Sequence, residues 1–156
     1  MNLSPIKYAD YKALHQIVLE VEPYSTKAMD IIGFISIMEA REGWTVFDDD
    51  EIIGCISLSD FIPKLNCVLH TFIKPDYHGK WLSDELCTIV FSHIFNTLEC
   101  RRVSGFCIAG ESDRAGKALE HIGFKQEGLH RKSALTDNGY RDLKIFGMLR
   151  EECRWL

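Results

Sequence analysis

The segment Asp76–Ser83 holds the first residues whose types and spacing could do chemistry. It follows an apolar run that ends at Lys74-Pro75, and it precedes apolar residues at helical spacing, so it is a strand-to-helix turn. A helix that begins just after a strand leaves backbone N–H groups unpaired, and these groups can hold a phosphate with the help of the helix dipole. Gly79 allows tight curvature, and His78 and Lys80 can add positive charge. The turn therefore suggests an anion site, although ordinary turns of this kind also hold a glycine and polar residues.

Positive charge is scarce in the rest of the chain. The 156 residues carry 18 basic and 23 acidic side chains, a formal charge of -5. This balance gives no general positive field for a phosphate backbone, so we expect no nucleic-acid partner. A phosphate-bearing ligand would depend on local cations, and His78, Lys80 and Lys117 are the few residues placed to supply them. The length and the 46% hydrophobic content predict one globular domain over residues 1–156.

The termini and the cysteines give no sign of export or of a metal. The start lacks a basic region followed by an apolar run, and no apolar stretch approaches the ~20 residues of a membrane span. We therefore expect a soluble, cytoplasmic protein without a membrane partner. The six cysteines form no CxxC pair and mostly lie in apolar runs. Reduced, buried thiols fit this pattern better than a disulfide or a metal site.

The hydrophobic spacing predicts an α/β domain with a mixed central sheet flanked by helices. The element order is β-α-α-β-β-β-α-β-α-β-β. Because no linker or repeat interrupts it, one continuous domain is the simplest account. The predicted helices are Asp10–Val21, Ser25–Glu42, a long helix from about Leu82 to Glu99, and Asp113–Ile122 closed by Gly123; the predicted strands are Trp44–Phe47, Ile52–Leu58, Cys67–Ile73, Arg102–Ala109, one from Phe124 and one from Tyr140 to Leu149.

The segment Asp113–Gly128 carries a recognisable pattern. Ala118-Leu119-Glu120-His121-Ile122-Gly123-Phe124, with Glu127-Gly128 after it, resembles the helix-and-strand signature of the GNAT superfamily, the Gcn5-related N-acetyltransferases. Downstream, Gly139-Tyr140-Arg141-Asp142 resembles the Gly-x-Tyr-x-Asp strand of ribosomal-protein-type members. Together with the element order, the resemblance covers nearly the whole chain. It implies the GNAT fold and transfer of an acetyl group from acetyl-CoA to an amine.

The resemblance also implies where acetyl-CoA binds. In this family the turn before the third helix holds the pyrophosphate on its backbone amides, which places the cofactor against the strand end and the adjoining turn. A further contact comes from the start of the fourth helix. The implied cofactor-binding residues are Phe72, Ile73, His78, Gly79, Lys80, Trp81, Leu82, Ser83, Asp113 and Lys117.

The chain departs from the family pattern at several positions, and His78 stands where the motif has Gln or Arg. Trp81 and Ser83 stand where the motif has glycines, and an indole at 81 must point away or occupy space that the cofactor would use. Asp113 replaces an asparagine that contacts the cofactor; as an N-cap it is favourable, but near phosphate it would repel. Leu119 replaces a tyrosine that protonates the departing thiolate. Direct transfer then needs another acid, with Tyr140, a water or a histidine as the options.

Three residues are candidates for catalysis. His70 lies on the strand that the family uses to hold the acetyl group, and an imidazole titrates near neutral pH, so it is our candidate base. Glu111 could act through a water or bind the amine. Tyr140 shares a strand face with Asp142 and is the third candidate. A packing or solvated role remains open for each, and the acidic cluster Asp48–Glu51 fits a charged hairpin tip better than a substrate trap.

The residues are consistent with two functions of different classes. The first is an acyl-CoA-dependent N-acetyltransferase that acts on an amine of a small molecule or protein. The second is a catalytically degenerate GNAT-fold binding or assembly protein, because both motif glycines and the acid tyrosine are replaced. The turn and the C-terminal Glu-Glu-Cys-Arg-Trp-Leu also loosely resemble GNAT-like bacteriophage proteins, including head-assembly accessory proteins. A homodimer or a phage-protein partner stays open, with the apolar Trp155-Leu156 as a docking candidate.

Overall fold

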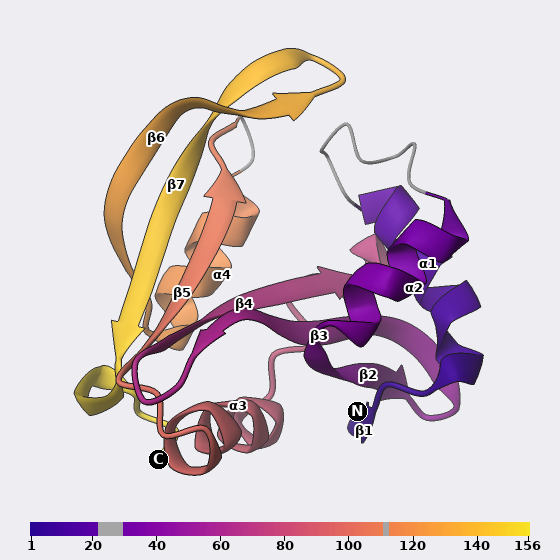
Figure 1. Cartoon of the computed structure of the whole chain (residues 1–156), viewed down its shortest axis with the longest axis horizontal. Coiled ribbons are helices and arrows are strands. Elements are labelled where there is room, and N and C mark those ends of the chain that lie inside the picture. The colour runs from indigo at the N-terminus through magenta and orange to yellow at the C-terminus, as the bar shows by residue number, and fades with distance from the viewer. Residues whose placement is uncertain (22–29, 111–112) are drawn as a thin grey trace. The chain divides into compact units, whose positions relative to one another are not determined.

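The computed structural model describes residues 1–21, 30–110 and 113–156 (Figure 1). Its helices and strands follow the predicted order. The strands are β1 (Asn2–Pro5), β2 (Glu42–Asp48), β3 (Glu51–Ile62), β4 (Asn66–Ile73), β5 (Arg102–Ile108), β6 (Lys125–Thr136) and β7 (Gly139–Leu149). The helices are α1 (Tyr11–Val21), α2 (Ile31–Glu39), α3 (Asp84–Ser92) and α4 (Arg114–Ile122), with a short 3-10 turn at Pro75–Tyr77 and a π-helical segment at His93–Thr97.

The described strands form a seven-stranded mixed sheet in the order β1-β2-β3-β4-β5-β7-β6. The α/β fold with flanking helices is therefore confirmed. The chain groups into two compact units, one made of Met1–Ser59 with Leu69–Leu86, the other of Asp60–Val68 with Cys87–Leu156. Strands β3 and β4 each contribute residues to both units.

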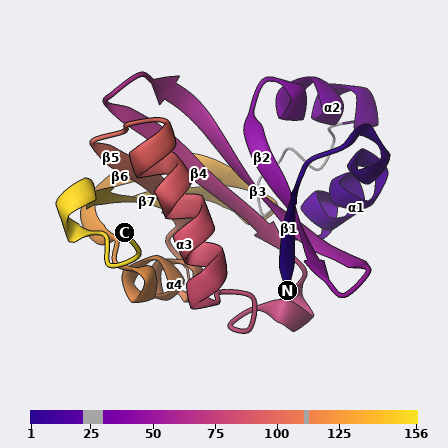
Figure 2. The same cartoon turned by 90° about the horizontal axis from the view of Figure 1, so that it is seen from below.

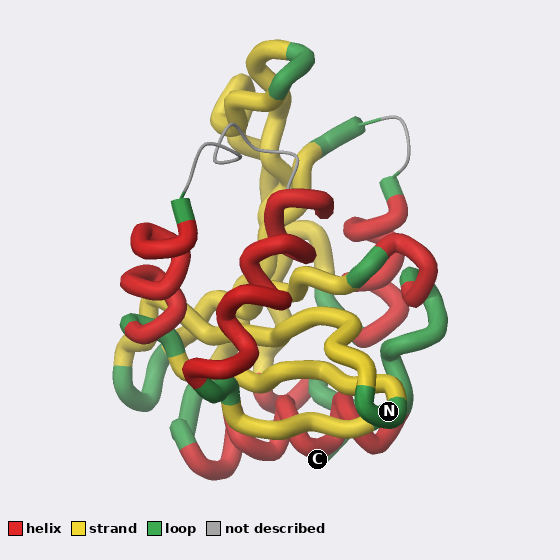
Figure 3. The backbone as a smooth tube through the Cα atoms, turned by 90° about the vertical axis from the view of Figure 1, so that its right-hand side faces the viewer, coloured by secondary structure: helices red, strands yellow, loops and turns green. Residues whose placement is uncertain are grey.

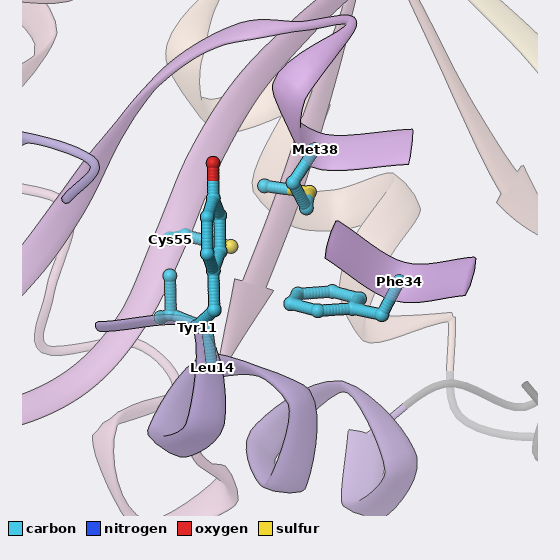
Figure 4. Close-up of a cluster of buried hydrophobic side chains, with 5 residues drawn as sticks. All are labelled: Tyr11, Leu14, Phe34, Met38 and Cys55. Carbon is cyan, nitrogen blue, oxygen red and sulfur yellow. The ribbon is translucent and has the colours of Figure 1, made fainter. Parts of the chain in front are cut away.

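The first unit has a core between its two helices and its strands. β1 pairs antiparallel with β2, and β2 with β3. Figure 2 shows α1 and α2 together beside β2. Five buried side chains form the core cluster: Tyr11, Leu14, Phe34, Met38 and Cys55. Figure 4 shows the four side chains from α1 and α2 turned toward Cys55 of β3. The rings of Tyr11 and Phe34 meet edge to face with centroids 6.3 Å apart, a favourable aromatic geometry.

The second unit is a sheet with α4 beside it. The start of β4 pairs parallel with β5, whereas β7 pairs antiparallel with both β5 and β6. Figure 1 shows α4 alongside β5, and Figure 3 shows β6 and β7 as long strands joined by a short turn. Gly105 of β5 lies under the helix: a Cβ there would be 3.3 Å from Leu119 Cδ2. Gly123 ends α4 in the left-handed region at φ 110, as the sequence predicts.

Two predicted helices have different ends in the structure. The second helix was expected over Ser25–Glu42, but it ends at Glu39, because Glu42 pairs with Leu58 and begins β2. It starts at Ile31, where Asp30 accepts a capping hydrogen bond from Gly33 N at 2.8 Å; residues 25–29 lie outside the described residues. The third helix begins at Asp84 rather than Leu82, and its last turns become the π-helical segment.

The C-terminal residues bind the end of α4 in the same chain. Trp155 Nε1 donates to Ile122 O at 3.2 Å, and Arg154 donates to His121 O at 2.9 Å while stacking on the indole. These carbonyls belong to the last turn of α4, which has no helical donors left for them. Trp155 therefore has an intrachain role, and only Leu156 of the proposed docking pair is exposed. Among the described helices, none is both long and apolar enough to cross a membrane.

Candidate active site

Backbone hydrogen bonds fix the turn that follows β4. Lys74 N donates to Ile53 O of β3 at 2.9 Å, which holds the strand end in place. The 3-10 turn Pro75–Tyr77 comes next, and Lys80 N closes the following turn on Tyr77 O at 3.0 Å. Between them Gly79 takes φ 80, and a Cβ added to it would meet no described atom within 4 Å, so the backbone there is open. The tight curvature predicted at Gly79 is confirmed.

The imidazole of His78 folds back onto the end of β4. Its Nε2 lies 2.8 Å from Ile73 O. A carbonyl oxygen can only accept, so Nε2 carries a proton and donates it to Ile73 O. His78 is thereby held beside the strand end. Its Nε2–H is committed to the Ile73 carbonyl oxygen.

A carboxylate from the β2–β3 hairpin holds the same turn. Glu51 accepts from Lys74 Nζ at 2.6 Å and from Tyr77 Oη at 2.9 Å. The bonds from Lys74 and then Tyr77 hold the pKa of Glu51 below its ordinary value, and the bond to Glu51 raises the pKa of Tyr77. The acidic hairpin tip thus has a structural task. The sequence gives no cue for it, because Glu51 and Lys74 are 23 residues apart and meet only through strand pairing.

The start of α3 is less open to an anion than the sequence suggests. Ser83 Oγ accepts from Leu86 N at 3.2 Å, so it caps the helix and satisfies one of its free donors. Asp84 and Glu85 add two carboxylates in the first turn. Trp81 and Leu82 are half-buried. Lys80 is exposed, and along the chain it precedes the acidic first turn of α3.

His70 on β4 is held by a side chain of β3. Its Nε2 lies 2.8 Å from Ser59 Oγ, and the imidazole is half-buried. Side chains alternate along a strand, so His70 lies on the same face as Phe72, which packs against the core cluster from α1 and α2. The structure thereby shows which face of β4 carries the His70 side chain, a question that strand alternation in the sequence could not answer. Ser59 was not foreseen, since the contact crosses between two strands.

In the second unit, Asp113 stands at the N-cap position of α4 without capping it. Its Oδ2 accepts instead from Lys144 Nζ of β7 at 2.5 Å, and this bond raises the pKa of Lys144. Oδ1 is buried with no hydrogen-bond partner among the described residues. A Cβ on Gly116 would collide with Oδ1, so the carboxylate lies close against the helix and would have to shift if this residue had a side chain. The prediction that Asp113 caps the helix through its side chain is wrong, because the carboxylate accepts from Lys144 instead.

The remaining candidates lie in the second unit or outside the described residues. Lys117 is exposed on α4, and Tyr140, 70% exposed, pairs with Leu135 across the β6–β7 hairpin. Asp142 Oδ1 accepts from Lys132 N at 2.8 Å, where β6 bulges. Glu111 lies outside the described residues. The structure thus groups His70, Phe72, Ile73 and residues 78–83 in one unit, and Asp113, Lys117 and Tyr140 in the other.

The six cysteines are free thiols. Five of them are buried and Cys153 is half-buried. Burial raises the pKa of Cys55 to about 12. Within residues 1–21, 30–110 and 113–156, no group of three or more His, Cys, Asp or Glu side chains could hold a metal ion. The predicted burial of the cysteines is confirmed for five of the six.

The strand order, the parallel β4–β5 pair and the turn before α3 define a mixed α/β fold of the acetyltransferase type. The chain belongs to the GNAT acetyltransferase family: the family described as "Acetyltransferase (GNAT) domain" matches residues 1–125. The GNAT resemblance read from the sequence is therefore confirmed, and with it membership of an N-acetyltransferase family.

Individual relatives agree with this assignment. "Probable N-acetyltransferase YjcK" of Bacillus subtilis (strain 168) is 26% identical over 109 residues, which is 67% of this chain and 58% of that protein. The chain thus spans less than two thirds of the length of this relative. Spermidine N-acetyltransferase from Vibrio cholerae, solved with CoA and spermine, matches with a TM-score of 0.83 at 17% identity, over 97% of this chain and 96% of that chain. An acetyltransferase (GNAT family) from Bacillus anthracis matches with a TM-score of 0.75 at 16% identity, over 96% and 95%. At these identities the solved structures show the fold.

Proposed function

We propose that the chain, as a single acyltransferase domain over residues 1–156, transfers an acetyl group from acetyl-CoA to an amine by direct attack. The observation that carries this proposal is the placement of His70 on β4, half-buried and hydrogen-bonded to Ser59, in a chain of the GNAT acetyltransferase family. A neutral amine attacks a thioester best when a positioned base removes its proton, and an imidazole is suited to this at neutral pH.

In this proposal, the residues of the first unit have separate roles in binding and catalysis. The backbone of Phe72 and Ile73 holds the acyl end, and the turn His78–Ser83 receives the pyrophosphate, with Lys80 and His78 as the cations. As the amine nitrogen bonds to the thioester carbon, His70 accepts the amine proton and the C–S bond breaks. The departing thiolate needs a proton, and Leu119 cannot give one. Tyr140, whose phenol is exposed, is the proposed donor, with a water as the alternative.

Two further candidate cofactor residues belong to the second unit. Lys117 is exposed on α4 and offers a further cation, and Asp113 is the residue in the position of the family's asparagine. Because Lys144 pairs with its carboxylate, Asp113 presents less repulsion to a phosphate than a lone aspartate would. Glu111, which lies just before this segment, remains our candidate for activating or binding the amine through a water.

The acceptor amine is identified by assaying candidate amines. The Vibrio cholerae relative is named for spermidine, so polyamines belong in the first set of acceptors, together with peptide N-termini and lysine side chains. CoA release from acetyl-CoA in the presence of each amine measures transfer. For the best acceptor, His70→Ala should lower kcat about 100-fold, the lower range for a general base, with the affinity for acetyl-CoA unchanged.

A matched histidine variant controls this test. His121 is exposed in the last turn of α4 and has no role in the proposed reaction, so His121→Ala should behave as wild type. Ser59→Ala should lower kcat less than His70→Ala does, because it removes one hydrogen bond to the imidazole and keeps the base itself. Unchanged turnover in His70→Ala would remove the histidine from the mechanism.

One observation favours a second candidate, a GNAT-fold binding or assembly protein that has lost efficient use of acetyl-CoA. The first turn of α3 is capped by Ser83 and carries Asp84 and Glu85, which oppose a bound pyrophosphate. Such a protein would act with a partner, either a second copy or a phage head-assembly protein as the C-terminal residues suggest. No acetyl-CoA binding at millimolar concentration would favour this candidate over the enzyme.

A further inference from the structure

Glu51 joins the start of β3 to both ends of the 3-10 turn after β4. Its carboxylate accepts from Lys74 Nζ at 2.6 Å and from Tyr77 Oη at 2.9 Å. Lys74 precedes the turn Pro75–Tyr77, and Tyr77 is its last residue. The backbone bond from Lys74 N to Ile53 O adds to these contacts. Three bonds from one end of β3 therefore fix this short segment, and all their atoms lie in the same compact unit.

Tyr77, once fixed, controls the conformation of residues 78–80. Lys80 N donates to Tyr77 O at 3.0 Å and closes the turn around Gly79, which has left-handed backbone and open space around it. His78 is tied to Ile73 O on the other side. The position of Tyr77 thus fixes the Lys80 amide in the turn and sets the backbone at Gly79, whose amide is the group that a bound phosphate would meet.

The protonation states at neutral pH suit this arrangement. Hydrogen bonds from Lys74 and Tyr77 keep the pKa of Glu51 below its ordinary value, so the carboxylate is charged and accepts from both donors. The pKa of Tyr77 is raised by its bond to Glu51, so the phenol keeps its proton. The charge of Lys74 is matched by Glu51, which leaves Lys80 as the cation next to the Gly79 amide along the chain.

We propose that Glu51 is a positioning residue for the acetyl-CoA turn: it holds Lys74 and Tyr77 so that the turn closed by Lys80 N and Tyr77 O presents the Gly79 amide to the pyrophosphate. This inference rests on the proposed function, since it assigns a role in the same site. Glu51 itself touches no substrate and acts only through its two partners. Removing its charge should loosen the turn, raise KM for acetyl-CoA and leave kcat nearly unchanged.

The test compares Glu51→Gln and Glu51→Ala with a matched control. Glu99→Gln removes an exposed carboxylate that pairs with Lys64 at 3.7 Å within the other unit, so it repeats the charge change at a residue with no bond to the turn among the described contacts. The first readout is hydrogen exchange of the protein without acetyl-CoA. Both Glu51 variants should speed exchange of the Lys80 amide, whose acceptor is Tyr77 O, while Glu99→Gln should leave it at the wild-type rate.

The second readout is the KM and kcat for acetyl-CoA. For an exposed ion pair, we expect KM to rise about three- to fivefold in Glu51→Gln with kcat within about twofold of wild type. Tyr77→Phe, which keeps the ring but loses the hydrogen bond, should give part of this rise. A merely structural role would lower stability in both Glu51 variants without separating KM from kcat.

The outcomes separate the two claims. Wild-type protein that fails to bind acetyl-CoA refutes the proposed function, and the exchange rate of the Lys80 amide still decides whether Glu51 holds the turn. Wild-type binding with unchanged KM in Glu51→Gln overturns the positioning role while the proposed function stands. Tighter binding in Glu51→Gln also overturns it, because the carboxylate would then be competing with phosphate for Lys74.

Discussion

At Gly54, β3 lies close to the backbone of β4, and replacing this glycine with alanine tests the strand geometry that the proposed site needs. A Cβ at this position would lie 2.9 Å from Ile73 Cα, 2.7 Å from Ile73 Cδ1 and closer still to the Phe72 carbonyl oxygen. Two carbon atoms in contact are normally about 3.5–4.0 Å apart. The backbone of β4 must therefore move by at least about 0.6 Å, because backbone cannot turn aside as a flexible side chain does.

The expected cost comes from this overlap. Overpacking a well-packed interior destabilises a protein by about 1–3 kcal/mol. For a chain of this size, that corresponds to a fall in Tm of roughly 2–12 °C. Because Phe72 and Ile73 are the residues displaced, the Kd for acetyl-CoA should also rise in Gly54→Ala at temperatures where the protein is folded. Thermal unfolding and a calorimetric titration measure the two effects.

Gly128 provides the matched control for this prediction. It also lies in a strand, but a Cβ there would meet only Ile145 Cγ1 at 3.9 Å among the described atoms, an ordinary contact. Gly128→Ala should therefore change stability by no more than about 0.5 kcal/mol, or raise it slightly by restricting the unfolded chain. A Gly54→Ala protein with the same Tm and the same Kd as wild type would refute the close approach of β3 and β4.

Three further predictions concern other parts of the chain. Trp81→Gly should leave acetyl-CoA affinity intact or strengthen it in a titration, since the indole replaces a motif glycine; a large loss would show that the indole contacts the cofactor. A thiol reagent at pH 8 should modify Cys153 first and leave Cys55, with its pKa of about 12, unmodified until unfolding; rapid labelling of Cys55 would contradict its burial. Glu152, whose pKa is lowered by Lys125 and then by the Leu149 amide, should stabilise the fold fully above the ordinary glutamate pKa of about 4.3 and lose this effect as the pH falls further. The Tm difference between wild type and Glu152→Gln should thus be larger at pH 7 than at pH 3, and an equal difference at both would count against the ion pair.

The element order could be read from the sequence because it depends on local patterns. Apolar spacing placed α1, α4 and the strands, and single glycines with special backbone angles were recognisable at Gly79 and Gly123. The ends of the helices and strands were harder to predict from the sequence. Glu42 has a good helix propensity, yet pairing with Leu58 draws it into β2, so a nonlocal contact outweighs the local preference.

The site residues were predictable where the family pattern fixes their position along the chain, and not where their partners are distant. His70 could be named as a candidate from its strand, but its bond to Ser59 depends on the pairing of β3 with β4. Asp113 was expected to cap α4, whereas Lys144 from β7, 31 residues away, takes its carboxylate. In each case the side chain bonds to a partner that only the folded sheet brings near.

The most direct test of the proposed activity is thermal unfolding of the wild-type protein during a titration with acetyl-CoA. A ligand that binds only the folded state stabilises it by about 2.7 kcal/mol at a concentration 100 times its Kd. For a chain of this size, the Tm should then rise by roughly 5–11 °C. CoA lacking the acetyl group should give a similar rise, because the pyrophosphate turn would hold both. A Tm that stays constant up to millimolar acetyl-CoA would contradict the acetyltransferase proposal and favour a GNAT-fold binding protein.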